Sequence, residues 1–159
     1  MKYTILALAF LGITLPASAQ TEAQSLPTSP AIIDIGDTEI NLTVELADDP
    51  AELATGLMFR QGVPEGTGML FDFGNPREAN MYMRNVPFGL DMLFLDTDGE
   101  ILAIVARVQP FSERLINPGF PVQGVLEIGS GQANELGIEP GDIVRHAMFE
   151  DTDPATESE

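Results

Sequence analysis

The sequence predicts a mainly β protein, built as a single antiparallel β-sandwich or small barrel with one or two short helices. Short stretches of alternating or continuous apolar residues recur along the chain, and turn residues separate them. Helix signals occur in two short segments. The chain has 159 residues, 44% of them hydrophobic and 20% charged, which is the composition of one folded domain.

The N-terminal segment, residues 1–19, has the pattern of a secretory signal peptide. Lys2 supplies a short positive region, residues 5–15 are apolar, and the sequence ASA ending at Ala19 is a small-x-small cleavage site. The apolar stretch is shorter than the roughly 20 residues that span a bilayer. We therefore expect a mature protein that begins at Gln20, a periplasmic or secreted location, and no stable membrane insertion after cleavage.

The rest of the chain divides into three parts by composition. Residues 20–30 are polar, contain two prolines and are predicted to be a disordered lead-in. Residues 31–149 form the predicted folded domain, and residues 150–159, with five acids, form a predicted disordered tail. The absence of Cys excludes disulfides and thiol chemistry.

Seven stretches have the pattern of strands. Leu42, Val44 and Leu46 alternate with polar residues, which indicates a half-buried strand. The apolar runs 91–95 and 101–108 indicate central strands, and the turn DTDG between them indicates a hairpin. The other predicted strands are residues 69–73, 77–84, 122–128 and 143–149.

Two short helices are expected. Asp49 is placed to cap the first helix, the proline that follows suits the first turn, and Glu52 stands at the capping-box position. Gly56 is expected to end this helix. The second helix is expected over residues 132–136, ended by Gly137.

Several motifs occur in order between residues 40 and 145. They are VELA (44–47), GLMFR (56–60), GMLFDF (68–73), MYMRN (81–85), LDMLFLD (90–96), VLE (125–127) and LGI-x-PGD (136–142). In these motifs the chain resembles the family called domain of unknown function 192. The resemblance implies a single, mainly β, sandwich-type domain, often behind a signal peptide, and leaves the biochemical role open. This chain has Arg84 and Val86 where that family usually has Lys and Thr.

A polar cluster of Arg60, Arg84, Asn85 and Asp91 is the candidate ligand-binding site. Asp91 opens the most apolar run of the chain, so its carboxylate is expected at the strand end or in an ion pair, because burying a bare charge is costly. Arg84 or Arg60 is the expected partner, and Arg side chains suit carboxylate or phosphate ligands. The alternative is a purely structural cluster that holds the ends of the sheet.

The charge of the chain excludes some partners. The full sequence carries −18, and the 19 acids and 6 Arg of residues 31–149 leave −13. A polyanion is bound through Lys and Arg, so nucleic acid and anionic membrane surfaces are not expected as partners. The acidity is expected to be a solvating shell, with a surface for a basic partner as the alternative.

The sequence favours an exported, soluble, non-enzymatic domain that binds a small ligand, an anionic one included, or a protein partner. No cofactor and no metal are expected. One alternative is a hydrolase that uses paired carboxylates, given the many acids. A Ser-His-Asp triad would have to use His146 with Ser112 or Ser130, and neither serine stands in a nucleophile elbow.

The second alternative is a Met-rich copper-binding accessory protein. Thioethers select Cu(I), whereas methionine also fills irregular gaps in hydrophobic cores. The methionines concerned are Met58, Met69, Met81, Met83 and Met92.

Overall fold

The structure is a computed structural model that describes residues 22–150, so the predicted signal peptide and all but the first residue of the predicted tail lie outside the described residues. Seven strands form one sheet with the order β5-β4-β6-β3-β2-β1-β7. The strands are β1 (Thr28–Ile35), β2 (Thr38–Ala47), β3 (Thr67–Glu78), β4 (Leu90–Leu95), β5 (Ile101–Val108), β6 (Pro121–Gly129) and β7 (Ile143–Arg145).

Two short α-helices accompany the sheet, α1 (Pro50–Thr55) and α2 (Gln132–Leu136), and a 3-10 turn, η1 (Ala147–Phe149), follows β7. The predicted mainly β fold class is therefore confirmed. None of the helices in residues 22–150 is long and apolar enough to cross a membrane.

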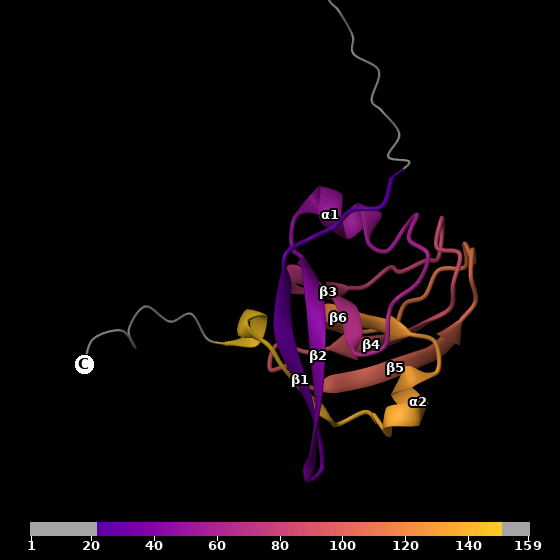
Figure 1. The fold of residues 1–159 in the computed structure, drawn as a ribbon. Helices are drawn as coiled ribbons and strands as arrows, with labels where there is room; N and C mark the ends of the chain where they lie inside the picture. The colour runs from indigo at the N-terminus through magenta and orange to yellow at the C-terminus, as the bar shows by residue number, and fades with distance from the viewer. Residues whose placement is uncertain (1–21, 151–159) are drawn as a thin grey trace, which may run out of the picture.

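The sheet curls strongly into a half-barrel (Figure 1). Its two edges meet where Glu100, just before β5, bridges Ile143 of β7. The N–H of Val144 also donates to the carbonyl of Gly99 at 2.8 Å. Gly99 has φ 81°, and a Cβ at this position would overlap the Val144 carbonyl. The curl lets one sheet enclose its own core without a second sheet.

One strand pair differs from the predicted antiparallel arrangement. β2 and β3 are parallel, whereas the other pairs are antiparallel. Parallel neighbours need a long crossover in place of a hairpin. Residues 48–66, which contain α1, supply this crossover. α1, in this crossover, and α2, between β6 and β7, lie at opposite ends of the half-barrel (Figure 1).

The first helix begins and ends where the sequence predicts. The Asp49 carboxylate accepts hydrogen bonds from two N–H groups of the first turn, at 2.8 and 2.9 Å. The Glu52 carboxylate accepts a hydrogen bond from the N–H of Asp48 at 3.3 Å. A capping box would use the N–H of Asp49, the next residue. Gly56 ends the helix with φ 47°, and a Cβ there would lie 3.0 Å from the Phe71 ring. The loop after α1 therefore lies tightly against β3.

The chain joins the sheet earlier than predicted. β1 begins at Thr28, so the predicted disordered lead-in to residue 30 is wrong at its C-terminal end. Before β1, the Gln24 amide donates to two carbonyls at α1, each at 3.0 Å, and Leu26 packs against the core. Pairing with β2 along its whole length, and with β7 at residues 32–34, gives β1 backbone partners and outweighs the polar composition.

Two predicted strands are shorter than their patterns indicated. The stretch 77–84 leaves the sheet after Glu78 and continues as an irregular segment, in which Asn85 adopts φ 59°. The stretch 143–149 ends as a strand at Arg145. There the His146 ring accepts the N–H of Met148 at 3.1 Å and starts the 3-10 turn.

Buried side chains form two clusters, one on each face of the central strands. The first contains residues from all seven strands and fills the half-barrel. The second covers the other face of β3, β4 and β6, beneath the loop after α1 and the irregular segment after β3. Because side chains alternate along a strand, Leu70 belongs to the first cluster and Met69 and Phe71 to the second.

Candidate functional site

Glu127 is a buried acid that the sequence analysis did not select as a site residue. It lies on the central strand β6, is 4% exposed, and has Met69 of β3 and Met92 of β4 as its cross-strand neighbours. Its carboxyl makes no hydrogen bond or ion pair with any part of residues 22–150. Burial raises the pKa of Glu127 from 4.5 to about 8. The carboxyl is therefore mostly protonated at neutral pH.

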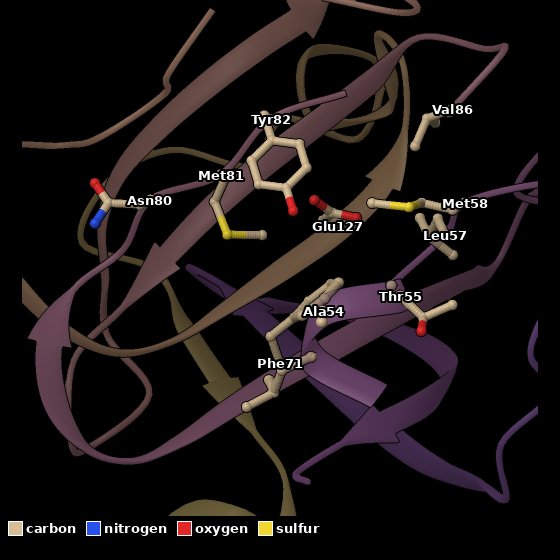
Figure 2. A pocket seen from close by; sticks show the side chains of 12 residues that line it. Ala54, Thr55, Leu57, Met58, Phe71, Asn80, Met81, Tyr82, Val86 and Glu127 are labelled. Carbon is tan, nitrogen blue, oxygen red and sulfur yellow. The ribbon is translucent and has the colours of Figure 1, made fainter. Parts of the chain in front are cut away.

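The Glu127 pocket is a cavity of about 60 Å³ that this carboxyl lines. Figure 2 shows the carboxyl pointing into the space between Met58, Met81 and Tyr82. The walls come from residues 53–58 of α1 and its following loop, from the segment after β3, and from β3 itself. The cavity has room for about two water-sized groups.

The two segments around the pocket are fixed to each other. The N–H of Phe59 donates to the carbonyl of Asn85 at 2.9 Å, and the Asn85 amide approaches the Met58 sulfur at 3.9 Å. Phe59 and Asn85 both adopt left-handed backbone conformations, with φ 64° and 59°. Such a conformation is uncommon for a residue other than glycine and often occurs at functional sites. The two segments that wall the pocket are therefore joined in a defined loop geometry.

The Glu127 pocket adjoins a wider groove of about 360 Å³. Leu53, Phe71, Asn80 and Met81 line both spaces, so the two lie side by side. In the groove, the Arg77 guanidinium lies 4.4 Å from the centre of the Phe73 ring. A molecule with a small end group and a longer body fits this arrangement.

The structure does not bring the four predicted site residues together. Arg60 forms a two-point ion pair with Glu45, with both N···O distances 2.7 Å, and this pair lowers the pKa of Glu45. Arg84 is exposed, with its guanidinium 5.0 Å from the centre of the Tyr82 ring. Arg84 and Asn85 thus contact residues that line the Glu127 pocket, whereas the charge of Arg60 is balanced inside the protein.

Asp91 lies on the face of β4 directed away from the pocket and is 0% exposed. Its carboxylate accepts the backbone N–H groups of Arg107 at 2.7 Å and of Gly131 and Ala133 at 2.9 Å each. The expected ion pair with an arginine is wrong, since these three amides take the place of the cation. Asp91 ties β5 and the start of α2 to β4, which is a structural role.

His146 cannot activate a serine in this structure. Its Nδ1 accepts the N–H of Met148, so the neutral ring carries its proton on Nε2. Nε2 lies 2.7 Å from the Ser29 hydroxyl and donates to it, and burial lowers the pKa of His146. The partner is neither Ser112 nor Ser130. No Ser-His-Asp hydrolase site is formed by these groups.

The five methionines meet in the second cluster. Met69, Met83 and Met92 are fully buried, whereas Met58 and Met81 are half-buried and line the Glu127 pocket. Within residues 22–150, no group of three or more His, Cys, Asp or Glu side chains is placed to hold a metal ion. The thioethers of Met58 and Met81, which line the same pocket as the Glu127 carboxyl, are the groups left for the copper alternative to use.

Comparison with known proteins decides the family. The family DUF192, described as Uncharacterized ACR, COG1430, matches residues 31–146. The chain belongs to the DUF192 family. This confirms the resemblance seen in the motifs. No curated protein matches the chain.

Two solved structures resemble this DUF192 domain. One, from Sinorhizobium meliloti 1021, is described as a "putative transcription regulator"; it is 37% identical, with a TM-score of 0.75 over 82% of this chain and 99% of that chain. The other is a protein of unknown function from Novosphingobium aromaticivorans DSM 12444, 34% identical, with a TM-score of 0.74 over 85% of this chain and 99% of that chain.

Four of the seven motifs that carry the DUF192 resemblance supply residues of the Glu127 pocket, including Phe71 from GMLFDF. GLMFR and MYMRN supply wall residues, and VLE ends in Glu127 itself. A signal for this site was present in the sequence. Alternation places Glu127 on the same face as Val125, within a strand pattern that is apolar on both faces, so the acid had to face buried surface.

Proposed function

We propose that this DUF192 domain is an exported, non-enzymatic binding protein whose ligand places a small end group in the Glu127 pocket. The observation that carries the proposal is a buried carboxyl with no protein partner among residues 22–150, directed into a cavity. The carboxyl is reached from the cavity, so a polar group placed there can form the hydrogen bond that the described residues do not supply.

The shape of the site supports a ligand of two parts. The inner cavity of about 60 Å³ accepts a group of very few atoms, and the adjoining groove of about 360 Å³ accepts the rest of the molecule. An engineered cavity that binds benzene is larger than the inner cavity, at about 150 Å³. The expected ligand therefore inserts one end and leaves its body in the groove.

The carboxylate-hydrolase alternative has less support. Paired-carboxylate catalysis needs a second acid about 5–10 Å from the first. Glu127 is the single acid among the described residues that line the pocket, and Glu78 in the groove is exposed. One carboxyl beside thioethers and aromatic rings fits recognition better than hydrolysis.

A transcriptional role, suggested by the description of the Sinorhizobium meliloti structure, is not supported by the charges of this chain. DNA is bound mainly through Lys and Arg on its phosphates. Residues 31–149 carry −13, and Arg60 and Arg145 are held in ion pairs with acids. We therefore do not propose nucleic acid as the ligand.

Nuclear magnetic resonance of the mature chain, residues 20–159, tests the proposal. The probes are four-carbon molecules with different end groups: n-butylamine, butyramide, butyrate and 1-butanol. At least one is expected to shift the amide resonances of residues 54–58, 80–82 and 126–128, with the millimolar affinity that such small molecules reach.

A pair of variants on α1 provides the control. Ala54 is exposed and lines the pocket, so Ala54→Phe should block its mouth and abolish the shifts. Ala51 is exposed on the same helix and does not line the pocket, so Ala51→Phe should leave them unchanged. Absence of pocket shifts with all four probes, or shifts that persist in Ala54→Phe, would contradict the proposed function.

A further inference from the structure

We infer that the end group accepted by the Glu127 pocket is a primary alkylammonium, of a free amine or a lysine side chain, with the Glu127 carboxylate as its counter-ion. The inference rests on the proposed function, because it names the ligand class of the same pocket. It differs from the anionic ligand that the predicted arginine cluster favoured.

The charge balance inside the pocket calls for a cation. Of the groups that face Glu127, β3 presents Met69 and Phe71 and β4 presents Met92 and Phe94, all apolar. Among the described lining residues, no Lys, Arg or His is present. An ionised Glu127 is therefore without a positive neighbour in the protein.

The charged and titratable groups nearest the pocket are already engaged or lie outside it. Tyr82 is the other titratable wall residue, and Arg84 lies against its ring with one nitrogen 3.3 Å from the hydroxyl. In the groove, Arg77 lies over Phe73, and Glu78 is exposed. Burial alone accounts for the raised pKa of Glu127, so neither arginine acts as its counter-ion.

The walls of the pocket suit an ammonium group. An ammonium has three N–H donors, and the Glu127 carboxylate and the Tyr82 hydroxyl are acceptors that face each other across the pocket. The aromatic rings of Tyr82 and Phe71 also line the pocket, and aromatic rings attract cations. An ammonium with its first methylene matches the room for about two water-sized groups.

Binding would be coupled to proton release. The free pocket holds Glu127 as a carboxylic acid, and the bound pocket holds it as a carboxylate, so the proton leaves to solvent while the ammonium keeps its own. Below about pH 8, each unit of pH then changes the affinity for an ammonium about tenfold. The increase stops above that pH, before the amine itself loses its proton near pH 10.4.

The experiment is a calorimetric titration of the mature chain with n-butylamine and with butyramide at pH 6, 7, 8 and 9. We expect the butylamine affinity to rise about tenfold from pH 6 to 7 and about tenfold again from pH 7 to 9. At pH 7, titrations in two buffers of different ionisation enthalpy should show release of nearly one proton per butylamine. Butyramide should bind without that rise.

Two variants separate the pocket from the general acidity of the protein. Glu127→Gln keeps the shape of the protonated carboxyl and should abolish both the pH dependence and the preference for butylamine over butyramide. Glu78→Gln removes an exposed acid of the adjoining groove and should keep the wild-type pH profile. Loss of the pH dependence in Glu78→Gln alone would overturn the assignment to Glu127.

The outcomes also separate this inference from the proposed function. The ammonium inference would be overturned, and the binding function would stand, if butyramide or butanol shifted the pocket resonances while butylamine did not bind. The same conclusion would follow if the butylamine affinity did not change between pH 6 and 8. Failure of all four probes would overturn both. Nα-acetyl-lysine amide distinguishes the sources: tighter binding than butylamine indicates a lysine side chain, and weaker binding indicates a free amine.

Discussion

The substitution Glu127→Gln should change how the stability of the domain depends on pH. In the wild type the folded carboxyl has a pKa of about 8, against 4.5 without burial. Between these values the native protein holds a proton that the unfolded chain releases, so the free energy of unfolding falls as pH rises. The glutamine variant resembles the protonated form at every pH and lacks this contribution.

The size of the effect follows from the same two pKa values. One unit of pH in this window corresponds to about 1.4 kcal/mol. The wild type should therefore lose about 5 kcal/mol relative to Glu127→Gln between about pH 4.5 and pH 8, and nothing further above it. Other titrating groups, such as Glu45 with its lowered pKa, are present in both proteins and cancel in the difference.

The measurement is urea unfolding of both proteins at pH 5, 6, 7, 8 and 9. We expect nearly equal stability at pH 5 and a variant that is more stable than the wild type by several kcal/mol at pH 8. A difference that stays constant from pH 5 to 9 would show that the folded carboxyl titrates normally, and would refute the argument that Glu127 is buried without a partner.

Four further predictions concern the rest of the chain. Asp91→Asn should lower the free energy of unfolding by roughly 3 kcal/mol, because an amide cannot accept all three N–H groups. The control is the exposed turn variant Asp98→Asn, whose free energy of unfolding should be within about 0.5 kcal/mol of the wild type. Equal effects of the two variants in denaturant unfolding would contradict this prediction. Asp49→Ala should cost about 0.5–2 kcal/mol through loss of the α1 cap, and a neutral result would mean that the cap contributes nothing. Mass spectrometry of exported protein should show a chain that begins at Gln20, and an intact Met1 would contradict the signal peptide. Equilibration with Cu(I) under reducing conditions should leave no tightly bound metal, and stoichiometric copper that is lost in Met58→Leu, Met81→Leu would revive the copper alternative.

Local patterns in the sequence were sufficient for most secondary structure. Alternation with a period of two identified β2, and continuous apolar runs identified β4 and β5, because each depends on neighbours along the chain. The caps of α1 followed from Asp49 and Gly56 for the same reason. β1 was missed because its polar N-terminal half is stabilised by pairing with β2, and its C-terminal half pairs with the distant strand β7 as well.

Local sequence patterns could not predict the candidate site. Glu127 could be placed on a buried face by alternation, and the sequence alone determined that much. The fold places residues 53–58 and 80–86 over β6. The tertiary structure therefore determines which segments cover this face and whether they bring a partner to the Glu127 carboxyl. Asp91 makes the same point, since both acids are buried on central strands. Backbone amides from β5 and α2 solvate Asp91, whereas Glu127 faces an open pocket, because only the tertiary structure decides which groups reach a buried charge.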